Sequence, residues 1–396
     1  MVDSRSYRLS NIDMIRGLVI IIMALDHVRT YFMITGTQHP MEQPDIPLDL
    51  YFTRWISHFC APVFVFLAGT SAGLMSARRT KHAMAKFLAT RGLWLIFVEV
   101  VIISTGWSFS PFEGAAALGG ARILVLQVIW AIGASMLVLA AAQYLGEKTC
   151  LAIGLIFLLG HNSLDSIWPA GTGLAGNDPL WYGLLSPSST TVGPYLLLSV
   201  YPVLPWIGVM LLGYGTAFVF KMPASQRDRV LIKAGLTMIV AFIIIRISGL
   251  YGDPNLWAVN NSSLQATMLD FMNITKYPPS LLFVLITLGP MSIVCAYADR
   301  VNGWFKNTLV IFGRVPFAFY VTHIYLIHAL SIAFGKYQGY STQELMTNAI
   351  FYPAGFNVGL IWVYVIWLAV VTMLYPLCKW VANVKAQRKD WWLSYL

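Results

Sequence analysis

The residues that could do chemistry begin in the first apolar stretch of the chain. Asp13, Arg16 and His27 recur there at spacings that place them on one face of a helix. A histidine with an ordinary pKa of about 6.5 can take up and return a proton at neutral pH, as acyl transfer to an amine or a hydroxyl requires. Asp26 either fixes the tautomer of His27 or pairs with Arg29, because adjacent helical residues point about 100° apart. We predict that His27 transfers a proton and that Asp26 supports it.

Other titratable side chains fall near the ends of later apolar stretches. His58 opens the second stretch, His39 lies in the loop before it, and His161 closes the fifth. Each of these histidines could instead serve helix-end hydrogen bonding or loop packing. The candidate catalytic residues are therefore His27, His58, His39 and Asp26. The candidate substrate-binding residues are Arg29, Arg54, His161, Asp165, Lys276 and Tyr277.

Membrane-spanning helices must position these groups. Hydrophobic residues make up 58% of the 396 residues and charged residues only 11%, whereas a soluble protein has about 25% charged residues. Apolar runs of about 20 residues, long enough to span a bilayer, recur along the chain. The predicted fold is an all-α polytopic membrane protein with about ten transmembrane helices, forming a single domain over residues 1–396. The expected spans are roughly 12–34, 57–76, 92–109, 122–142, 149–160, 195–220, 231–249, 278–297, 315–334 and 357–378.

The distribution of Lys and Arg predicts that both termini are cytoplasmic. Most of the 26 Lys and Arg lie in the two ends of the chain and in the loops after the second, fourth, sixth and eighth expected spans. The formal charge of +9 therefore reflects topology rather than nucleic-acid binding. A charged side chain facing lipid costs about 2.5–3.5 kcal/mol, so outer-side exceptions such as Arg54 and Lys276 should face protein, water or substrate. We predict a multi-pass protein of the plasma (inner) membrane with an extracytoplasmic site.

Charged residues at the cytoplasmic helix ends are candidates for binding an anionic cofactor. Arg16, Arg78 and Arg314 carry guanidinium groups that suit phosphates, and Asp13 lies beside Arg16. Ordinary anchoring to anionic lipid, and an ion pair between Asp13 and Arg16, are the structural alternatives. No HExxH or P-loop motif occurs, and no Cys/His spacing suits a metal. The sequence therefore predicts no metal.

Two motifs are distinctive. The first is Arg8-Leu-x-x-Ile-Asp13-x-x-Arg16-Gly17, which runs into Met-Ala-Leu-Asp26-His27, and the second is Ala61-Pro62-Val-Phe-Val-Phe-Leu-Ala-Gly69. Both resemble the catalytic family of heparan-α-glucosaminide N-acetyltransferase. Later phrases resemble a bacterial branch of that family, namely Gly160-His161-Asn162, Thr275-Lys-Tyr-Pro-Pro279 and Gly313-Arg-Val-Pro316.

This resemblance implies a multi-span enzyme that takes the acetyl group of acetyl-CoA from the cytoplasmic side and delivers it to an amino sugar on the opposite side. It also implies a catalytic histidine in the region after the first motif helix, here residues 35–57 followed by His58. His39 or His58 then fills that role with His27 in support, or His27 fills it. The 14 residues from Asp13 to His27 span about 21 Å of helix, comparable to an extended pantetheine arm.

Two further interpretations stay open. Pro-containing spans and intramembrane charges are also typical of a transporter for a small polar or sugar-like solute. An O-acyltransferase that decorates a cell-surface glycan is a variant of the leading hypothesis. The expected partners are membrane lipid, acetyl-CoA and a small-molecule or glycan acceptor, without nucleic acid, and a homodimer is one possible assembly.

Overall fold

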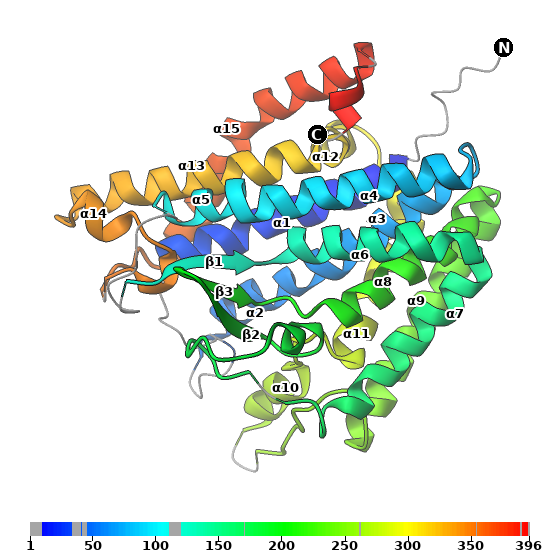
Figure 1. The fold of residues 1–396 in the computed structure, drawn as a ribbon, viewed down its shortest axis with the longest axis horizontal. Helices are drawn as coiled ribbons and strands as arrows, with labels where there is room; N and C mark the ends of the chain where they lie inside the picture. The colour runs from blue at the N-terminus through cyan, green and yellow to red at the C-terminus, as the bar shows by residue number, and fades with distance from the viewer. Residues whose placement is uncertain are drawn as a thin grey trace. The chain divides into compact units, whose positions relative to one another are not determined.

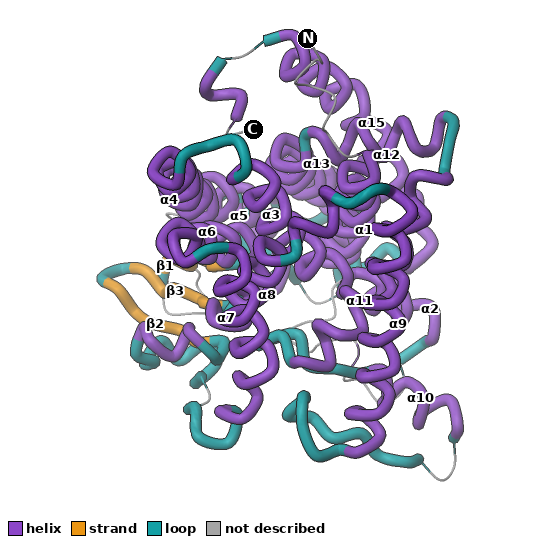
Figure 2. The backbone as a smooth tube through the Cα atoms, turned by 90° about the vertical axis from the view of Figure 1, so that its right-hand side faces the viewer, coloured by secondary structure: helices purple, strands orange, loops and turns teal. Residues whose placement is uncertain are grey.

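The computed structural model describes residues 10–33, 41, 46–110, 120–169, 171–260, 263–353, 355–388 and 390–394. Helices make up most of the described chain (Figures 1 and 2). The chain divides into two compact units, and each is described by itself below. Unit 1 contains Met1–Cys60, Val101–Arg122 and Tyr297–Leu396, and unit 2 contains Ala61–Val100 and Ile123–Ala296. The prediction of one domain over residues 1–396 stays a prediction.

Unit 1 is built around α1, which packs against α12, α13 and α15. Its helices are α1 (Ser10–Phe32), α2 (Leu48–Ile56), η2 (Ser57–Phe59), α5 (Ser104–Ser108), η9 (Ala298–Arg300), α12 (Trp304–Arg314), α13 (Pro316–Tyr337), α14 (Thr342–Leu345), η10 (Ala349–Phe351), α15 (Leu360–Gln387) and η11 (Trp391–Ser394). Glycines allow α1 and α12 to touch, because a Cβ built on Gly17 or Gly313 would overlap the backbone of the other helix. Most residues of α1 are buried, including charged ones, so α1 is a core helix of this unit.

Unit 2 consists of helices packed in pairs, α4 with α6, α7 with α8, and α6 with α8. Its helices are α3 (Cys60–Ser76), α4 (Lys81–Phe97), the π-helical turn η3 (Val98–Ile103), α6 (Val128–Ala142), η5 (Gln143–Leu145), α7 (Glu147–Gly160), η6 (His161–Leu164), η7 (Leu180–Leu184), α8 (Val203–Gly215), η8 (Ala217–Lys221), α9 (Ala224–Ser248), α10 (Leu264–Met272) and α11 (Leu281–Tyr297). The helices α3, η3 and α11 each continue across the boundary with unit 1. Gly92 and Gly133 bring α4 and α6 close together, since a Cβ on either would lie 2.7 Å from the other's carbonyl oxygen.

Helices occupy all ten stretches that were predicted to span the membrane. Among the described residues, eight helical segments are long and apolar enough to cross a bilayer. These are Leu48–Ser76, Lys81–Ser108, Val128–Leu145, Val203–Lys221, Ala224–Ser248, Leu281–Arg300, Pro316–Tyr337 and Leu360–Gln387. The remaining two predicted spans are α1, which is rich in charge, and α7, which has 14 residues. A multi-pass membrane protein is thus confirmed, while the count of ten and the cytoplasmic termini stay predictions.

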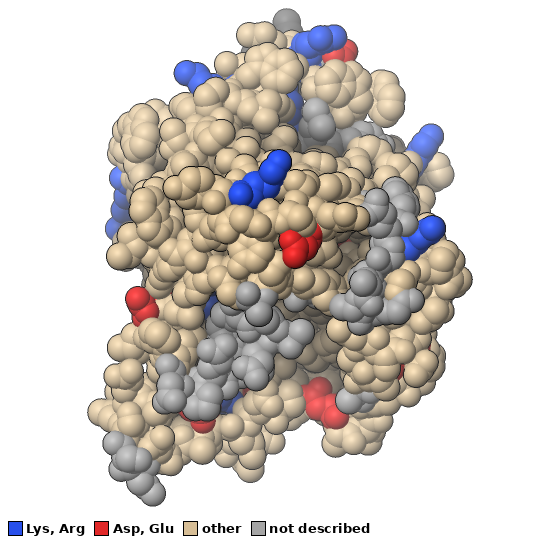
Figure 3. Space-filling model, turned by 90° about the vertical axis from the view of Figure 1, so that its left-hand side faces the viewer, with Lys and Arg blue, Asp and Glu red and all other residues tan. Residues whose placement is uncertain are grey.

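The surface agrees with a lipid environment. Figure 3 shows a face on which Lys, Arg, Asp and Glu are few and widely separated. Large apolar side chains are exposed on α9 and α15, for example Ile244, Ile247, Ile361 and Leu368. Such exposed apolar surface is rare on soluble monomers and is expected where hydrocarbon replaces water.

A small sheet was not predicted. In the described chain, β1 (Arg122–Leu126), β2 (Ser188–Val192) and β3 (Tyr195–Ser199) form one sheet in the order β1-β3-β2 (Figure 2). Strands β2 and β3 are antiparallel, with Ser188 opposite Ser199. The predicted span starts at about 122 and 195 are therefore wrong, since α6 begins at Val128 and α8 at Val203. A short apolar run has no period that separates a strand from a helix.

Candidate active site

The central feature of unit 1 is a pair of histidines from α1 and α13. His27 Nδ1 lies 2.7 Å from His323 Nε2, and the two rings are stacked with centroids 5.0 Å apart. Helix α13 begins with Pro316 at its first turn, where a fixed φ and a missing N–H are well tolerated. His323 is completely buried, whereas His27 is partly exposed. The pair is therefore open to a ligand only from the side of His27.

The hydrogen-bond network assigns the protons of this pair. His323 Nδ1 lies 3.0 Å from the Phe319 carbonyl oxygen, which can only accept, so Nδ1 carries the proton. Nε2 of a neutral His323 is then an acceptor, and Nδ1 of His27 must donate to it. A neutral His27 consequently keeps its lone pair on Nε2. His27 is held in the tautomer that a base acting through Nε2 requires.

Aromatic rings surround the imidazole of His27. Trp107 and Tyr320 meet it edge-on, with ring centroids 5.1 and 6.3 Å away. Tyr31 stacks on Trp107 and donates a hydrogen bond of 2.7 Å to its carbonyl oxygen. The indole N–H of Trp107 is buried and has no hydrogen-bond partner within the described ranges. These rings limit the access of water to His27, which strengthens the electrostatic interactions of a bound substrate.

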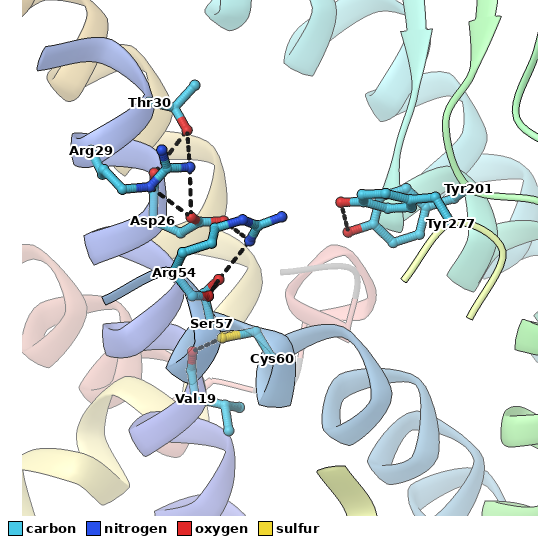
Figure 4. Close-up of polar contacts among 9 residues, drawn as sticks. All are labelled: Val19, Asp26, Arg29, Thr30, Arg54, Ser57, Cys60, Tyr201 and Tyr277. Carbon is cyan, nitrogen blue, oxygen red and sulfur yellow. Dashed lines mark hydrogen bonds and ion pairs between the residues drawn. The ribbon is translucent and has the colours of Figure 1, made fainter. Parts of the chain in front are cut away.

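Asp26 is engaged by two arginines (Figure 4). One carboxylate oxygen lies 3.1 Å from Arg29 Nη2 and the other 3.0 Å from Arg54 Nη1. Arg54 also donates to Ser57 Oγ at 2.7 Å. Both arginines are more than nine-tenths buried. Of the two alternatives for Asp26, the pairing with Arg29 is present, and His323 is the group that orients His27.

Of the other two catalytic candidates, the structure describes His58 but not His39. His58 lies in η2, which contacts α1, and only 1% of its surface is exposed. It follows Arg54 and Ser57 in the same helical segment. His39 lies outside the described residues. The structure thus brings Asp26, Arg29, Arg54 and the segment with His58 to one end of α1.

At the other end of α1, Asp13 lies between two arginines. Arg16 Nη1 is 3.1 Å from one Asp13 oxygen and 3.3 Å from the Gly313 carbonyl oxygen. Arg314 Nε is 3.9 Å from the other Asp13 oxygen, and 45% of the Arg314 side chain is exposed. The ion pair expected as an alternative for Asp13 and Arg16 is present, and the more loosely held guanidinium of Arg314 can reach an anion. Arg78, in unit 2, is an exposed residue after α3.

The remaining substrate-binding candidates surround a turn of unit 2. His161 Nδ1 and Nε2 lie 3.0 Å from the Phe157 and Pro279 carbonyl oxygens. Burial lowers the pKa of His161, although hydrogen bonds to these carbonyls oppose that shift. Burial also raises the pKa of Asp165. Both nitrogens of His161 engage backbone, which favours the loop-packing alternative for this residue.

Lys276 and Tyr277 belong to the same turn. Lys276 is buried, and its ammonium lies 5.1 Å from the centroid of the Tyr277 ring. The Tyr277 hydroxyl lies 3.4 Å from the Tyr201 hydroxyl (Figure 4). Within the described ranges, no group of three or more His, Cys, Asp or Glu residues is placed to hold a metal ion.

Sequence reasoning missed the partner of His27. Local spacing draws no attention to His323, because the five residues between it and His328 put the two histidines on different faces of a helix. The available signal was a histidine seven residues after Pro316 in a largely apolar helix. Trp107 and Tyr320 carry no sequence signal beyond their aromatic character.

Comparison with known families gives a match over much of the chain. A model of the heparan-alpha-glucosaminide N-acetyltransferase catalytic family matches residues 8–248. A search of curated proteins finds no match for the chain. The matched region includes α1 with His27 and ends before α13 with His323. Since the match covers more than half of the 396 residues, the chain belongs to the heparan-alpha-glucosaminide N-acetyltransferase catalytic family.

Proposed function

We propose that the protein is a transmembrane acetyltransferase that moves an acetyl group from cytoplasmic acetyl-CoA to an extracytoplasmic sugar or amino-sugar acceptor. The observation that carries this proposal is the contact of 2.7 Å between His27 and His323 inside the helices of unit 1. Burying a pair of histidines inside a membrane protein costs free energy, and ionisable residues at such positions usually mark a functional site. Family membership supplies the type of reaction. The proposed location is the plasma (inner) membrane, with both termini in the cytoplasm.

In the proposed reaction, Nε2 of His27 takes a proton from the amine or hydroxyl of the acceptor while that group attacks the thioester carbonyl. The new C–N or C–O bond forms, the C–S bond breaks, and the proton on His27 passes to the leaving thiolate. General base catalysis of this kind contributes about 10²- to 10⁴-fold. His323 holds His27 through Nδ1 during both proton transfers, so Nε2 stays the reacting atom.

The inner end of α1 supports the donor side of the reaction. Arg16 and Arg314 would bind phosphates of acetyl-CoA, and Asp13 would hold the two guanidinium groups in place. The 14 residues from Asp13 to His27 span about 21 Å. A pantetheine arm lying along α1 would therefore bring its thioester to His27. At the outer end, the pair of Arg29 and Arg54 around Asp26 is the proposed contact for the acceptor, together with His58 and His39. In unit 2, His161 and Asp165 would shape the binding loop.

The test uses purified protein in lipid vesicles with acetyl-CoA and glucosamine. Release of CoA and formation of acetylated sugar are measured for the wild type and for His27→Ala, His58→Ala and His39→Ala. His82→Ala is the matched control, because His82 is exposed in α4. We expect His27→Ala to lower turnover by about 10²-fold or more and the control to leave it unchanged.

Failure of the wild type to bind acetyl-CoA would overturn the proposal. Uptake of solute into vesicles without acetyl-CoA would instead support the transporter alternative, for which Pro290 within α11 and Pro376 within α15 are the structural motivation. If the products carry the acetyl group on oxygen, the O-acyltransferase variant is correct.

A further inference from the structure

Asp253 accepts hydrogen bonds from the turn between α10 and α11 of unit 2, residues 275–281. Thr275 donates to Asp253 through its backbone N–H at 2.9 Å and through its hydroxyl at 2.8 Å. The Ser280 hydroxyl donates to the same carboxylate at 2.7 Å. The Ser280 N–H also closes the turn by donating to the Thr275 carbonyl oxygen at 3.1 Å. One carboxylate therefore fixes both ends of the turn.

Residues of η6, which follows α7, also form hydrogen bonds with this turn. His161 Nε2 lies 3.0 Å from the Pro279 carbonyl oxygen. The Asn162 side-chain oxygen accepts a hydrogen bond of 2.9 Å from the Leu281 N–H. With both sides fixed, the residues at the tip of the turn are held in one geometry before any ligand arrives. Such preorganisation reduces the entropy lost on binding.

Lys276 sits in this turn, and its ammonium lies 5.1 Å from the centroid of the Tyr277 ring without an ion pair to a described carboxylate. Only 8% of its surface is exposed, and no described residue forms a hydrogen bond or an ion pair with its ammonium. The ammonium is not among the fully buried polar atoms that lack a partner, so it keeps surface that solvent or a ligand can reach. Other buried cations are matched, since Arg54 binds Asp26 and Arg246 binds four backbone carbonyls. Burying a cation without a nearby anion costs free energy. An anionic ligand bound beside the Lys276 ammonium would offset that cost.

One tyrosine lies beside this ammonium, and a second packs against the first. The ring of Tyr277 is 5.1 Å from Lys276 Nζ, and the Tyr201 and Tyr277 rings meet edge to face with centroids 5.1 Å apart (Figure 4). The amphipathic ring of a tyrosine offers a flat apolar face and a hydroxyl that donates or accepts. This combination suits a sugar ring better than it suits a bare inorganic ion.

We propose that Lys276, Tyr277 and Tyr201 form a binding site for a sugar that carries a carboxylate or a phosphate. The ammonium receives the anionic group and the tyrosines receive the ring. Binding needs neither acetyl-CoA nor turnover, so this site can be tested separately from the acetyltransferase reaction.

The experiment is isothermal titration calorimetry of the purified full-length protein with glucuronate and with glucose 6-phosphate, without acetyl-CoA. Glucose and inorganic phosphate are the reference ligands for the ring alone and the anion alone. The variants are Lys276→Met, which removes the charge but keeps the stem, and Lys276→Arg, which keeps the charge. Lys336→Met is the matched control, because Lys336 is an exposed lysine at the end of α13.

We expect at least one anionic sugar to bind more tightly than both reference ligands. Lys276→Met should weaken that binding at least about tenfold and Lys276→Arg by less, while Lys336→Met leaves it unchanged. Without ligand, the Lys276→Met protein should melt close to the wild type, because the change removes a contact with the Tyr277 ring but no hydrogen bond or ion pair to a described residue. The proposal is overturned if no anionic sugar binds, if glucose or inorganic phosphate binds equally well, or if Lys276→Met binds as the wild type does. Absence of sugar binding in a protein that still releases CoA from acetyl-CoA would overturn this proposal alone, which separates it from a failure of the acetyltransferase proposal.

Discussion

The pair of His27 and His323 makes a sharp prediction for the variants His323→Phe and His323→Gln. Phe fills nearly the same space but offers no acceptor to the N–H of His27 Nδ1. Gln keeps an amide oxygen that can reach this N–H in place of His323 Nε2. Since His323 is completely buried and touches no solvent, any effect on turnover must act through His27 and not through direct contact with substrate. His323 is thus a positioning residue.

The size of the effect follows from the contact that is lost. A buried donor left without its acceptor costs about 1–3 kcal/mol. Because about 1.4 kcal/mol in an activation barrier changes a rate tenfold, His323→Phe should lower kcat about 5- to 150-fold. The KM for acetyl-CoA should change little, since the phosphates are expected to bind at the opposite end of α1. His323→Gln should recover most of the lost rate.

Acetyl transfer in lipid vesicles measures kcat and KM for the three proteins, and thermal melting shows whether each variant is folded. Nitrogen-15 NMR of histidine-labelled protein gives a readout that needs no turnover. It should show His27 protonated at Nδ1 in the wild type and a mixture of tautomers in His323→Phe. The reasoning fails if folded His323→Phe keeps the wild-type rate, or if the wild-type His27 carries its proton on Nε2.

Three further variants test the scaffold. Gly313→Ala should lower the melting temperature, because its Cβ would overlap the Asp13 carbonyl group. Overpacking of this kind costs about 1–3 kcal/mol. An unchanged melting temperature would contradict the close contact of α1 and α12. Arg246→Met should destabilise unit 2 by at least about 3 kcal/mol because four backbone carbonyls lose a charged donor, whereas the exposed Arg229→Met should be neutral in the same denaturation assay. Because burial lowers the pKa of His161 below its ordinary 6.5, the unfolded chain binds more protons, so stability should fall as pH drops below about 6.5. His161→Gln should flatten that part of a curve of melting temperature against pH, and an unchanged slope would contradict the assignment.

Much of the fold was predictable because membrane insertion imposes length and apolarity on each segment. Helices are present at every predicted span, and α1 was identified as unusual from its charges alone. The pairing of Asp26 with Arg29 was one of two stated alternatives, since a separation of three residues suits a helical ion pair. Its second partner, Arg54, lies 28 residues away in sequence and was expected only as a separate substrate-binding candidate.

The parts that escaped prediction depend on contacts between distant segments. His323 and His27 are separated by 296 residues, and no local spacing rule connects them. The strands β1 and β3 were also not predicted, because a short apolar run just before a helix resembles the first turns of that helix. Lys276 was singled out by its expected side of the membrane, but the absence of an ion pair with a described residue could be seen only in the structure.

The division of unit 1 between both ends of the chain affects how the protein is made. Ribosomes add about 5–20 residues per second, so His323 is synthesised about 15–60 s after His27. During that interval the first helix must reside in the translocon or the bilayer without its histidine partner. The ion pair with Arg29 can form at once, and Arg54 follows 28 residues after Asp26. Early neutralisation of Asp26 would keep α1 in the membrane until α13 arrives, so the residues that protect the nascent helix are distinct from those that later complete the site.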